Sequence, residues 1–493
     1  MEEFPWQSSG CGWSGLCSTN PSLFNESQLE TLFQQSLEVW REVPFRVQGT
    51  DEFYELLSDY GCAINGEQVT FPRPVRDKVL ARIADEKRAR EEADAGVSDW
   101  PESEVRMYTH GQGLHICDLE TNAHRPATEE DLAQWSHAVD ALGDVGRTHP
   151  TFIPTDVPVN SGDFHAFATI LLNSRKPHRV SVYSAPMLPF FIEACRIAKG
   201  SMEAVRKDPV FATKCWVNSP FMLTRENIEI AMEARRLLGT PIVFGHMPVA
   251  GGAGPVTIAG SLVQNTAESL ALCAMRLAVD DLTHGITPTS TVIDMKHASH
   301  RQSGPDLALH ILAGSQMDAY LFGRSPRIVL MGVGAQTVSA QSVYEKALAA
   351  AFNIAAGQRT LGIGCLAYSD VGSPVQLVLD YEMGLYFRHL FREVASDDEH
   401  VGMDTLLSTA PHGAFFLETE HTACFFREES WIPAFMDHRV PLAWAANPSD
   451  MIEQARARAR DLFANAENLC PLSEGQQQEI RELMNEADAA VRT

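Results

Sequence analysis

The sequence lacks the short motifs that most often reveal nucleotide, nucleophile or metal chemistry. No G-x-x-x-x-G-K-[ST] phosphate loop, G-x-S-x-G elbow or H-E-x-x-H metal helix occurs in its 493 residues. Its ten cysteines form no C-x-x-C pair, which argues against a zinc ribbon or a thioredoxin-type site. The first residues, MEEFPWQSSGCGWSGLC, lack the basic region and apolar core of a secretory signal. We therefore expect reduced cysteines and a cytoplasmic protein.

Positive charge is also scarce. Lys and Arg total 39 against 64 Asp and Glu, a net charge of −25. So acidic a surface repels phosphate backbones, so we expect no nucleic-acid partner. The longest run without these charged residues, 237–267, contains His246, Gln264, Asn265, prolines and glycines. This composition indicates a buried segment of a large domain and no membrane span.

From about residue 150 the sequence alternates short apolar strands with helices. Strands are expected at 151–155, 179–183, 212–217, 241–244, 291–295, 327–331 and 360–366, and helices at 162–174, 188–200, 225–238, 256–280, 305–313, 336–356 and 374–394. Repeated βα units over this length predict a (β/α)8 TIM barrel. A doubly wound sheet is the alternative, although no phosphate fingerprint follows the first strand.

The barrel is expected to carry extensions on both sides. We divide the chain into an N-terminal arm (1–26), N-terminal helices with a hairpin at 105–119 (27–147), the barrel (148–440) and C-terminal helices (441–493). The arm and the terminal helices suggest a homo-oligomer.

Residues 241–268 form the most distinctive stretch. A strand leads to His246 and then to the glycines Gly251, Gly252 and Gly254, after which Pro255 opens a long apolar helix. The glycines permit close backbone approach, and the N–H groups of the helix's first turn offer an anion or carboxylate site. A tight βα turn without a ligand explains the same pattern equally well.

The expected strand ends supply few paired carboxylates and no nucleophile–base pair. They are rich in aromatic residues, including Tyr108, Trp216 and Tyr368. Such rings suit a quaternary ammonium ion through cation–π attraction, although most aromatic residues simply pack in cores.

Several segments resemble the trimethylamine:corrinoid methyltransferase family. They are HMPVAGGAGPVTIAGSLVQNTAESLA (246–271), YEKALAAAFNIAAG (344–357), VQLVLDYEM (375–383), ETEHT (418–422) and FREESWIP (426–433), preceded by FRVQGTDEFYELLSDYGCAINGEQVTFP (45–72). The resemblance implies a (β/α)8 barrel that moves a methyl group from an amine to the Co(I) of a separate corrinoid protein. It covers nearly all of the chain after about residue 27.

The chain is written in the twenty ordinary amino acids, so it resembles the branch of this family without pyrrolysine. That branch implies a quaternary amine substrate, such as glycine betaine or a similar betaine. A quaternary nitrogen already departs as a neutral tertiary amine and needs no further activation. The segment GIGCLAYSDVGSP (362–374) departs from the family pattern, which leaves the exact substrate open.

The resemblance and the strand ends together give the expected site. Catalytic or polar contacts are assigned to His246, Asp294 and Gln336, substrate contacts to Tyr108, Trp216, Tyr368 and Arg327, and the corrinoid-facing turn to Gly251, Gly252 and Gly254. The substrate carboxylate is expected at Arg327, at Arg301 or at the helix N-terminus. No metal of the protein's own is expected.

Two other functions fit parts of the pattern. Lys296, His297 and His300 could serve a Schiff-base or metal-dependent barrel lyase or hydrolase. A betaine-binding barrel without catalytic activity is the second alternative.

Overall fold

A computed structural model describes residues 21–92, 105–178, 180–287, 291–324 and 332–491. The strand expected at 327–331, and with it Arg327, lies outside the described residues. No helix in the described ranges is both long and apolar enough to cross a membrane.

The described chain is a mixed α/β structure in which most helices follow the expected βα rhythm. The helices are α1 (Glu26–Glu42), α2 (Asp51–Tyr60), α3 (Arg73–Glu92), α4 (Glu129–Ala141), α5 (Gly162–Asn173), α6 (Leu188–Lys199), α7 (Met202–Lys207), α8 (Arg225–Leu238), α9 (Ile258–Asp280), α10 (Pro305–Phe322), α11 (Ala340–Ala355), α12 (Pro374–Leu390), α13 (Asp398–Val401), α14 (Met403–Thr409), α15 (Glu420–Glu429), α16 (Pro441–Ala446), α17 (Met451–Asn465) and α18 (Glu474–Val491).

The strands are short, two to four residues each. They are β1 (Phe45–Val47), β2 (Ala63–Asn65), β3 (Gln68–Thr70), β4 (Arg106–Thr109), β5 (His115–Cys117), β6 (His124–Pro126), β7 (Val145–Arg147), β8 (Val180–Ser181), β9 (Phe211–Ala212), β10 (Lys214–Val217), β11 (Met222–Leu223), β12 (Val243–His246), β13 (Val249–Ala250), β14 (Thr291–Asp294), β15 (Ser299–Arg301), β16 (Thr360–Ile363), β17 (Cys365–Leu366) and β18 (Val371–Gly372).

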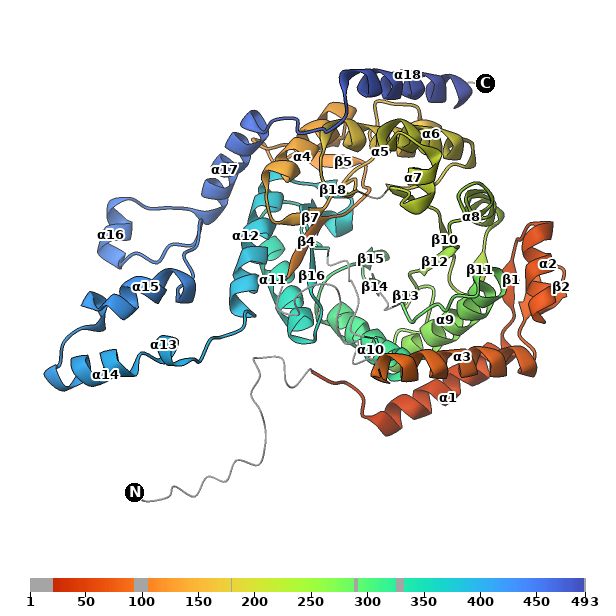
Figure 1. The fold of residues 1–493 in the computed structure, drawn as a ribbon, viewed down its shortest axis with the longest axis horizontal. Helices are drawn as coiled ribbons and strands as arrows, with labels where there is room; N and C mark the ends of the chain where they lie inside the picture. Colours follow the sequence, from red (N-terminus) through yellow and green to blue (C-terminus); the bar gives the residue numbers. More distant parts are fainter. Residues whose placement is uncertain (1–20, 93–104, 179, 288–290, 325–331, 492–493) are drawn as a thin grey trace.

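Parallel pairing dominates the central strands. β4 lies between β16 and β7, β8 pairs with β9, β10 with β12, and β13 with β14, all in parallel. A parallel bridge between Thr148 and His178 continues from β7 toward β8. Helices α4 to α12 surround these strands (Figure 1). Because the strands are so short, the ladders fall into separate sheets, and the described residues contain no closed barrel.

The hairpin expected at 105–119 is wrong. β4 runs parallel to β16 and β7, whereas β5 pairs with β6 and β18. The alternation of apolar residues there is genuine, but Gly111 (φ 141°) and Gln112 (φ 81°) carry the chain out of one sheet into another. Local patterning identifies a strand and cannot name its partner.

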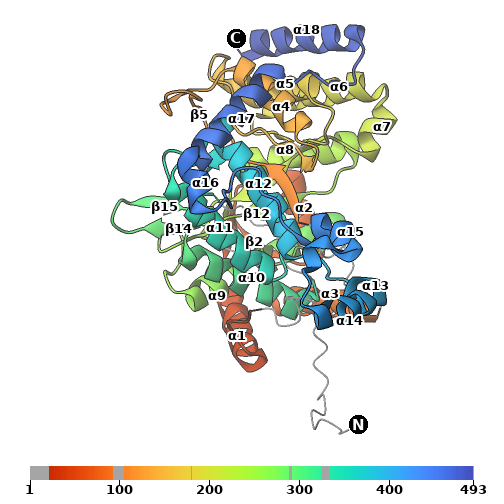
Figure 2. The same cartoon turned by 90° about the vertical axis from the view of Figure 1, so that its left-hand side faces the viewer.

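The chain's two ends cover opposite parts of the central unit. α1 and α2 pack on α9, and α3 on α10, through buried residues such as Leu29, Trp40 and Phe53. α17 packs on α12 and α4, and α18 lies across α5 and α6, at the end of the molecule opposite α1 (Figure 2). The terminal helices therefore pack on their own chain.

A buried histidine makes the fold sensitive to acid. His178 lies 5.6 Å from the Phe167 ring (centroid to centroid), and its Nε2 has no hydrogen-bond partner among the described atoms. Burial lowers the pKa of His178 to about 4. Its folded pKa is below the unfolded value of 6.5, so the unfolded state takes up a proton first as the pH falls, and stability is lost below about pH 6.5.

We predict that His178→Leu removes part of this acid sensitivity. From the two pKa values, wild type should lose about 2 kcal/mol at this residue between pH 7.5 and pH 5. Urea unfolding of wild type and variant at both pH values measures the loss of unfolding free energy. The carboxylates contribute equally to both proteins, so the difference between the two losses belongs to His178. An equal acid-induced loss in wild type and variant would contradict the prediction.

Candidate active site

The central strands present one face to the helices and the other to the interior. On β4, Met107 packs toward α12, where a Cβ added at Gly384 would lie 2.2 Å from the Met107 Sδ. Tyr108 therefore points to the opposite face. On β10, Cys215 and Val217 are buried in the helix-facing core, so Trp216 is likewise on the opposite face.

Tyr108 belongs to a cluster of three rings. Its ring centroid lies 5.9 Å from that of His110 and 6.3 Å from that of His149. Burial raises the pKa of the Tyr108 hydroxyl, which keeps it protonated. Burial, and next the charge of Lys346, hold the pKa of His110 well below its usual value, so its imidazole is neutral. The cluster thus combines an aromatic surface with the protonated Tyr108 hydroxyl and the neutral His110 imidazole.

His110 connects this cluster to the segment after β17. Ser369 Oγ lies 3.3 Å from His110 Nδ1 and donates to Gln302 Oε1 at 3.0 Å. The imidazole lies directly over Gly362, where a Cβ would be 2.3 Å from a ring carbon. His110 Nε2 is buried with no hydrogen-bond partner among the described atoms.

Tyr368 is the neighbour of Ser369 and adopts a left-handed backbone (φ 58°, ψ 34°). Its ring centroid lies 6.1 Å from that of His300, and its N–H donates to Val333 O at 2.7 Å. The His110–Ser369 contact therefore brings the backbone of Tyr368 to the edge of the cluster that contains Tyr108, while the Tyr368 ring lies beside His300 and Gly334. We call these residues the tyrosine–histidine cluster: Tyr108, His110, His149, Gln302, Ser369 and Tyr368.

Trp216 belongs to a different sheet, on the side of β10 that faces away from the helix-packed core. It is opposite Gly245 of β12, where a Cβ would approach the indole to 3.0 Å. The ammonium of Lys214 lies 5.5 Å from the Trp216 ring centroid. This ring is thus already in cation–π contact with a side chain of its own strand.

His246 points away from this face. It is buried against α9, where its Nε2 contacts Asn265 Oδ1 and lies 3.4 Å from Ser269 Oγ. Asn265 in turn donates to Thr287 O at 2.5 Å. Burial lowers the pKa of His246, and the nearby Glu268 charge opposes that shift. The contacts join β12 to α9.

We predict that His246→Ala lowers stability. The change leaves Asn265 Oδ1 buried without this partner and opens a cavity, at a cost of about 2–4 kcal/mol. Thermal unfolding would show the loss, and His246→Gln, which retains a donor, should recover part of it. An unchanged melting temperature in His246→Ala would contradict the packing role.

The glycine turn is held by bonds within itself. Gly251 N–H donates to Gly254 O at 2.9 Å, and the N–H groups of Gly252 and Gly254 donate to Val249 O. A Cβ at Gly251 (φ 83°) would lie 2.6 Å from Ile293. The helix starts at Ile258, with Thr257 as its N-cap, three residues later than expected from Pro255. The three glycine amides are therefore used inside the turn and are not free for an anion.

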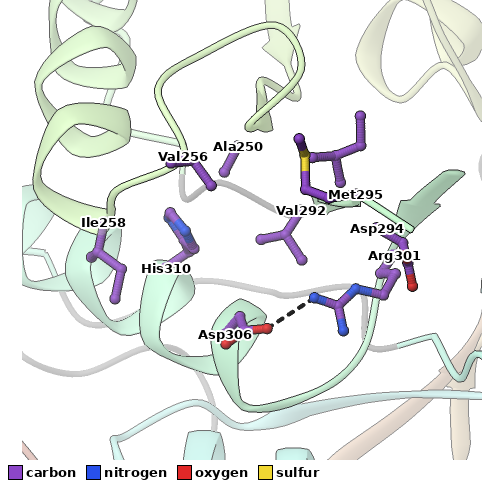
Figure 3. Close-up of a pocket in the computed structure, with 10 residues that line it drawn as sticks. Ala250, Val256, Ile258, Val292, Asp294, Met295, Arg301, Asp306 and His310 are labelled. Carbon is purple, nitrogen blue, oxygen red and sulfur yellow. Dashed lines mark hydrogen bonds and ion pairs between the residues drawn. The ribbon is translucent and has the colours of Figure 1, made fainter. Parts of the chain in front are cut away.

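A pocket of about 480 Å³ lies beside this turn (Figure 3). Its apolar wall includes Ala250, Val256 and Val292, and its polar residues are Asp294, Arg301, Asp306 and His310. Arg301 Nη2 pairs with Asp306 Oδ2 at 2.9 Å. The backbone N–H groups of His297 (3.1 Å) and Lys296 (2.8 Å) donate to Asp294 Oδ1. These hydrogen bonds, that of His297 first, lower the pKa of Asp294.

The other expected residues are scattered. Gln336 is exposed and precedes α11, which begins at Ala340, so the helix expected from 336 starts later. His297 is exposed, while His300 lies near Tyr368. In the described part of the chain, no three His, Cys, Asp or Glu side chains converge in a way that could hold a metal ion.

Half of the tyrosine–histidine cluster carries no signal in the sequence. Tyr108 and His110 stand together in the segment expected as a hairpin, whereas His149, Gln302 and Ser369 lie in connecting segments without a motif. One signal was available: Tyr108 and His110 are two residues apart, so on a strand both face one side.

The geometry can now be compared with known proteins. Residues 14–491 match the model of the trimethylamine methyltransferase (MTTB) family. The chain is 23% identical to the glycine betaine methyltransferase of Desulfitobacterium hafniense (strain Y51), over 90% of this chain and 92% of that protein. It is 22% identical to trimethylamine methyltransferase MttB of Methanosarcina barkeri, over 98% of both chains. The chain belongs to this family and is a methyltransferase.

Proposed function

We propose that this methyltransferase demethylates a quaternary amine, glycine betaine or a similar betaine, and passes the methyl group to the Co(I) of a corrinoid carried by a separate protein. The supporting observation is the tyrosine–histidine cluster, where the Tyr108 ring meets two imidazoles, of which His110 is neutral, without a carboxylate among its members. A quaternary ammonium cannot donate a hydrogen bond, so aromatic faces suit it better than charged acceptors. Similarity to a glycine betaine methyltransferase agrees with this choice.

Tyr108 and Tyr368 are the proposed contacts of the ammonium, with Trp216 as a further contact from a different sheet. Asp294 and Gln336 are proposed polar contacts nearer the rim, and His246 a positioning residue that fixes β12 on α9. Arg301 remains a candidate to bind the substrate carboxylate, because its hydrogen bond to Asp306 uses the Nη2 group of the guanidinium. Arg327, outside the described residues, is the other.

We further propose that the parallel strands form a (β/α)8 barrel. The support is the succession of parallel pairs from β16 through β4, β7, β8 and β9, then β10 with β12 and β13 with β14, inside a ring of helices. The tyrosine–histidine cluster would then lie where the strands end, as expected for an active site in this fold.

The corrinoid supplies the nucleophile, so the chain itself needs to bind, orient and dehydrate the substrate. The glycine turn is a poor cradle for a resident corrinoid, because its amides and its Cβ space are already used. A corrinoid that belongs to another protein fits this better. The glycines are proposed only as part of the surface that it approaches.

The test mixes the purified chain, a corrinoid in the Co(I) state and a panel of betaines. Loss of the Co(I) absorption together with release of the demethylated amine is the expected result. An unchanged spectrum with every quaternary amine would refute the proposal. Retained betaine binding by calorimetry, without transfer, would favour the binding-protein alternative.

A further inference from the structure

A long segment of this chain forms no hydrophobic core of its own. Residues 398–447, here called the C-terminal arm, contain α13, α14, α15 and α16, and none of its residues is buried. The arm extends away from the surrounding helices beyond α12 (Figures 1 and 2). The chain then returns, because α17 packs against α12 and α4. The arm is therefore an excursion with both ends fixed to the body.

The exposed surface of this arm is unusually apolar. Its exposed large apolar side chains are Val401, Met403, Leu406, Leu407, Phe415, Phe416, Leu417, Phe426, Ile432, Met436, Val440, Leu442 and Trp444. Together they present on the order of 1,000 Å² of apolar surface, whereas monomeric proteins rarely expose patches above a few hundred Å². Its helices have four to ten residues, too short to persist in water without packing. The arm needs a cover.

The body carries an apolar face close to the base of this arm. Tyr344 (68% exposed) and Leu348 (55% exposed) are four residues apart on α11 and form one stripe. On the adjacent α12, Tyr386 and Leu390 form a second stripe. The arm touches α12 through the Trp431 ring, which lies beside Tyr386 and His389, and through Ala434 N–H, which donates to Glu382. Tyr386 and Leu390 nevertheless remain exposed.

We propose that a second copy of this chain supplies the cover: the C-terminal arm of one copy packs on the α11–α12 face of its partner, and the reverse. One chain carries both the uncovered arm and an uncovered face at its base, which is the arrangement that a two-fold interface requires. Two such contacts would bury on the order of 2,000 Å² in all, which reaches the range of obligate dimers. In the proposed reaction a corrinoid protein must leave after each transfer, so it is a poor permanent cover.

The test is the mass of the full-length chain by light scattering at micromolar concentration. Wild type should have the mass of two copies or an even multiple. Leu417→Glu or Leu442→Glu in the arm, and Tyr344→Glu or Leu348→Glu on the face, should lower that mass. Val159→Glu is the matched control, because Val159 is 93% exposed and lies outside both surfaces. It should leave the mass unchanged.

Mixing the variants distinguishes lost contacts from misfolding. An arm variant and a face variant together still offer one intact arm and one intact face, so a mixed dimer should form where neither variant dimerises alone. A monomeric wild type would overturn the proposal and assign the arm to a different protein. Unchanged mass in the variants, or failure of the mixture to associate, would also overturn it. None of these readouts depends on methyl transfer.

Discussion

Replacing Tyr108 by Leu should raise the KM for the betaine substrate about 30-fold, the effect of losing about 2 kcal/mol of cation–π attraction at a desolvated site. The reason is the position of the ring beside two imidazoles, of which His110 is neutral. The nitrogen is fully charged in the bound substrate and loses charge as the methyl leaves. The ring therefore stabilises the bound ground state at least as much as the transition state, so kcat should stay constant or rise slightly while the KM rises.

Two comparisons make this measurement specific. Tyr108→Phe keeps the ring and should stay within about threefold of wild type. In 3,3-dimethylbutyrate a carbon atom replaces the ammonium nitrogen of glycine betaine, so the shape and the carboxylate stay and the positive charge is lost. Its inhibition constant should hardly differ between wild type and Tyr108→Leu. Equal losses for the betaine and the isostere would show that Tyr108 provides shape alone. A normal KM in Tyr108→Leu would remove it from the site.

The helices could be predicted because their signals are local. Helical spacing of Leu29, Leu32 and Trp40 identifies the buried side of α1, and Thr128 with Asp131 identifies the start of α4, where both capping bonds are present. The expected ranges of α5, α6 and α8 agree with the structure to within about a residue. The strand partners could not be predicted in this way. β4 pairs with a strand more than 250 residues away, and nothing in its own sequence specifies that neighbour.

The site was harder to predict than the fold. Tyr108 and Tyr368 were expected in one place, and the structure brings their segments together through His110 and Ser369. His246 was expected at the same place, but residue alternation on β12 sends it with Phe244 toward α9. The strand was expected to end at Phe244, two residues early, so His246 was placed in the following loop and not on β12. The domain limits at 26, 147 and 440 stay predictions.

A buried ion pair acts electrostatically on the tyrosine–histidine cluster. Lys346 of α11 and Asp380 of α12 are fully buried, with Nζ and Oδ2 3.3 Å apart. Asp380 also accepts the N–H of Gly364 at 2.9 Å and the amide of Gln376 at 2.6 Å. Burial raises the pKa of Asp380, and the Lys346 charge opposes that shift. The same charge lowers the pKa of His110, so the pair also acts on the site.

Removing one partner of this pair should be far more damaging than removing both. Asp380→Leu leaves an ammonium buried without its carboxylate, and Lys346→Met leaves the reverse, each at about 3–5 kcal/mol of unfolding free energy. The double variant Lys346→Met/Asp380→Leu leaves no uncompensated charge, so it should lose clearly less than the sum of the single losses. Urea unfolding of the four proteins measures the coupling. Additive losses would show that the pair is electrostatically silent, and the neutral imidazole of His110 would then have to be attributed to burial alone.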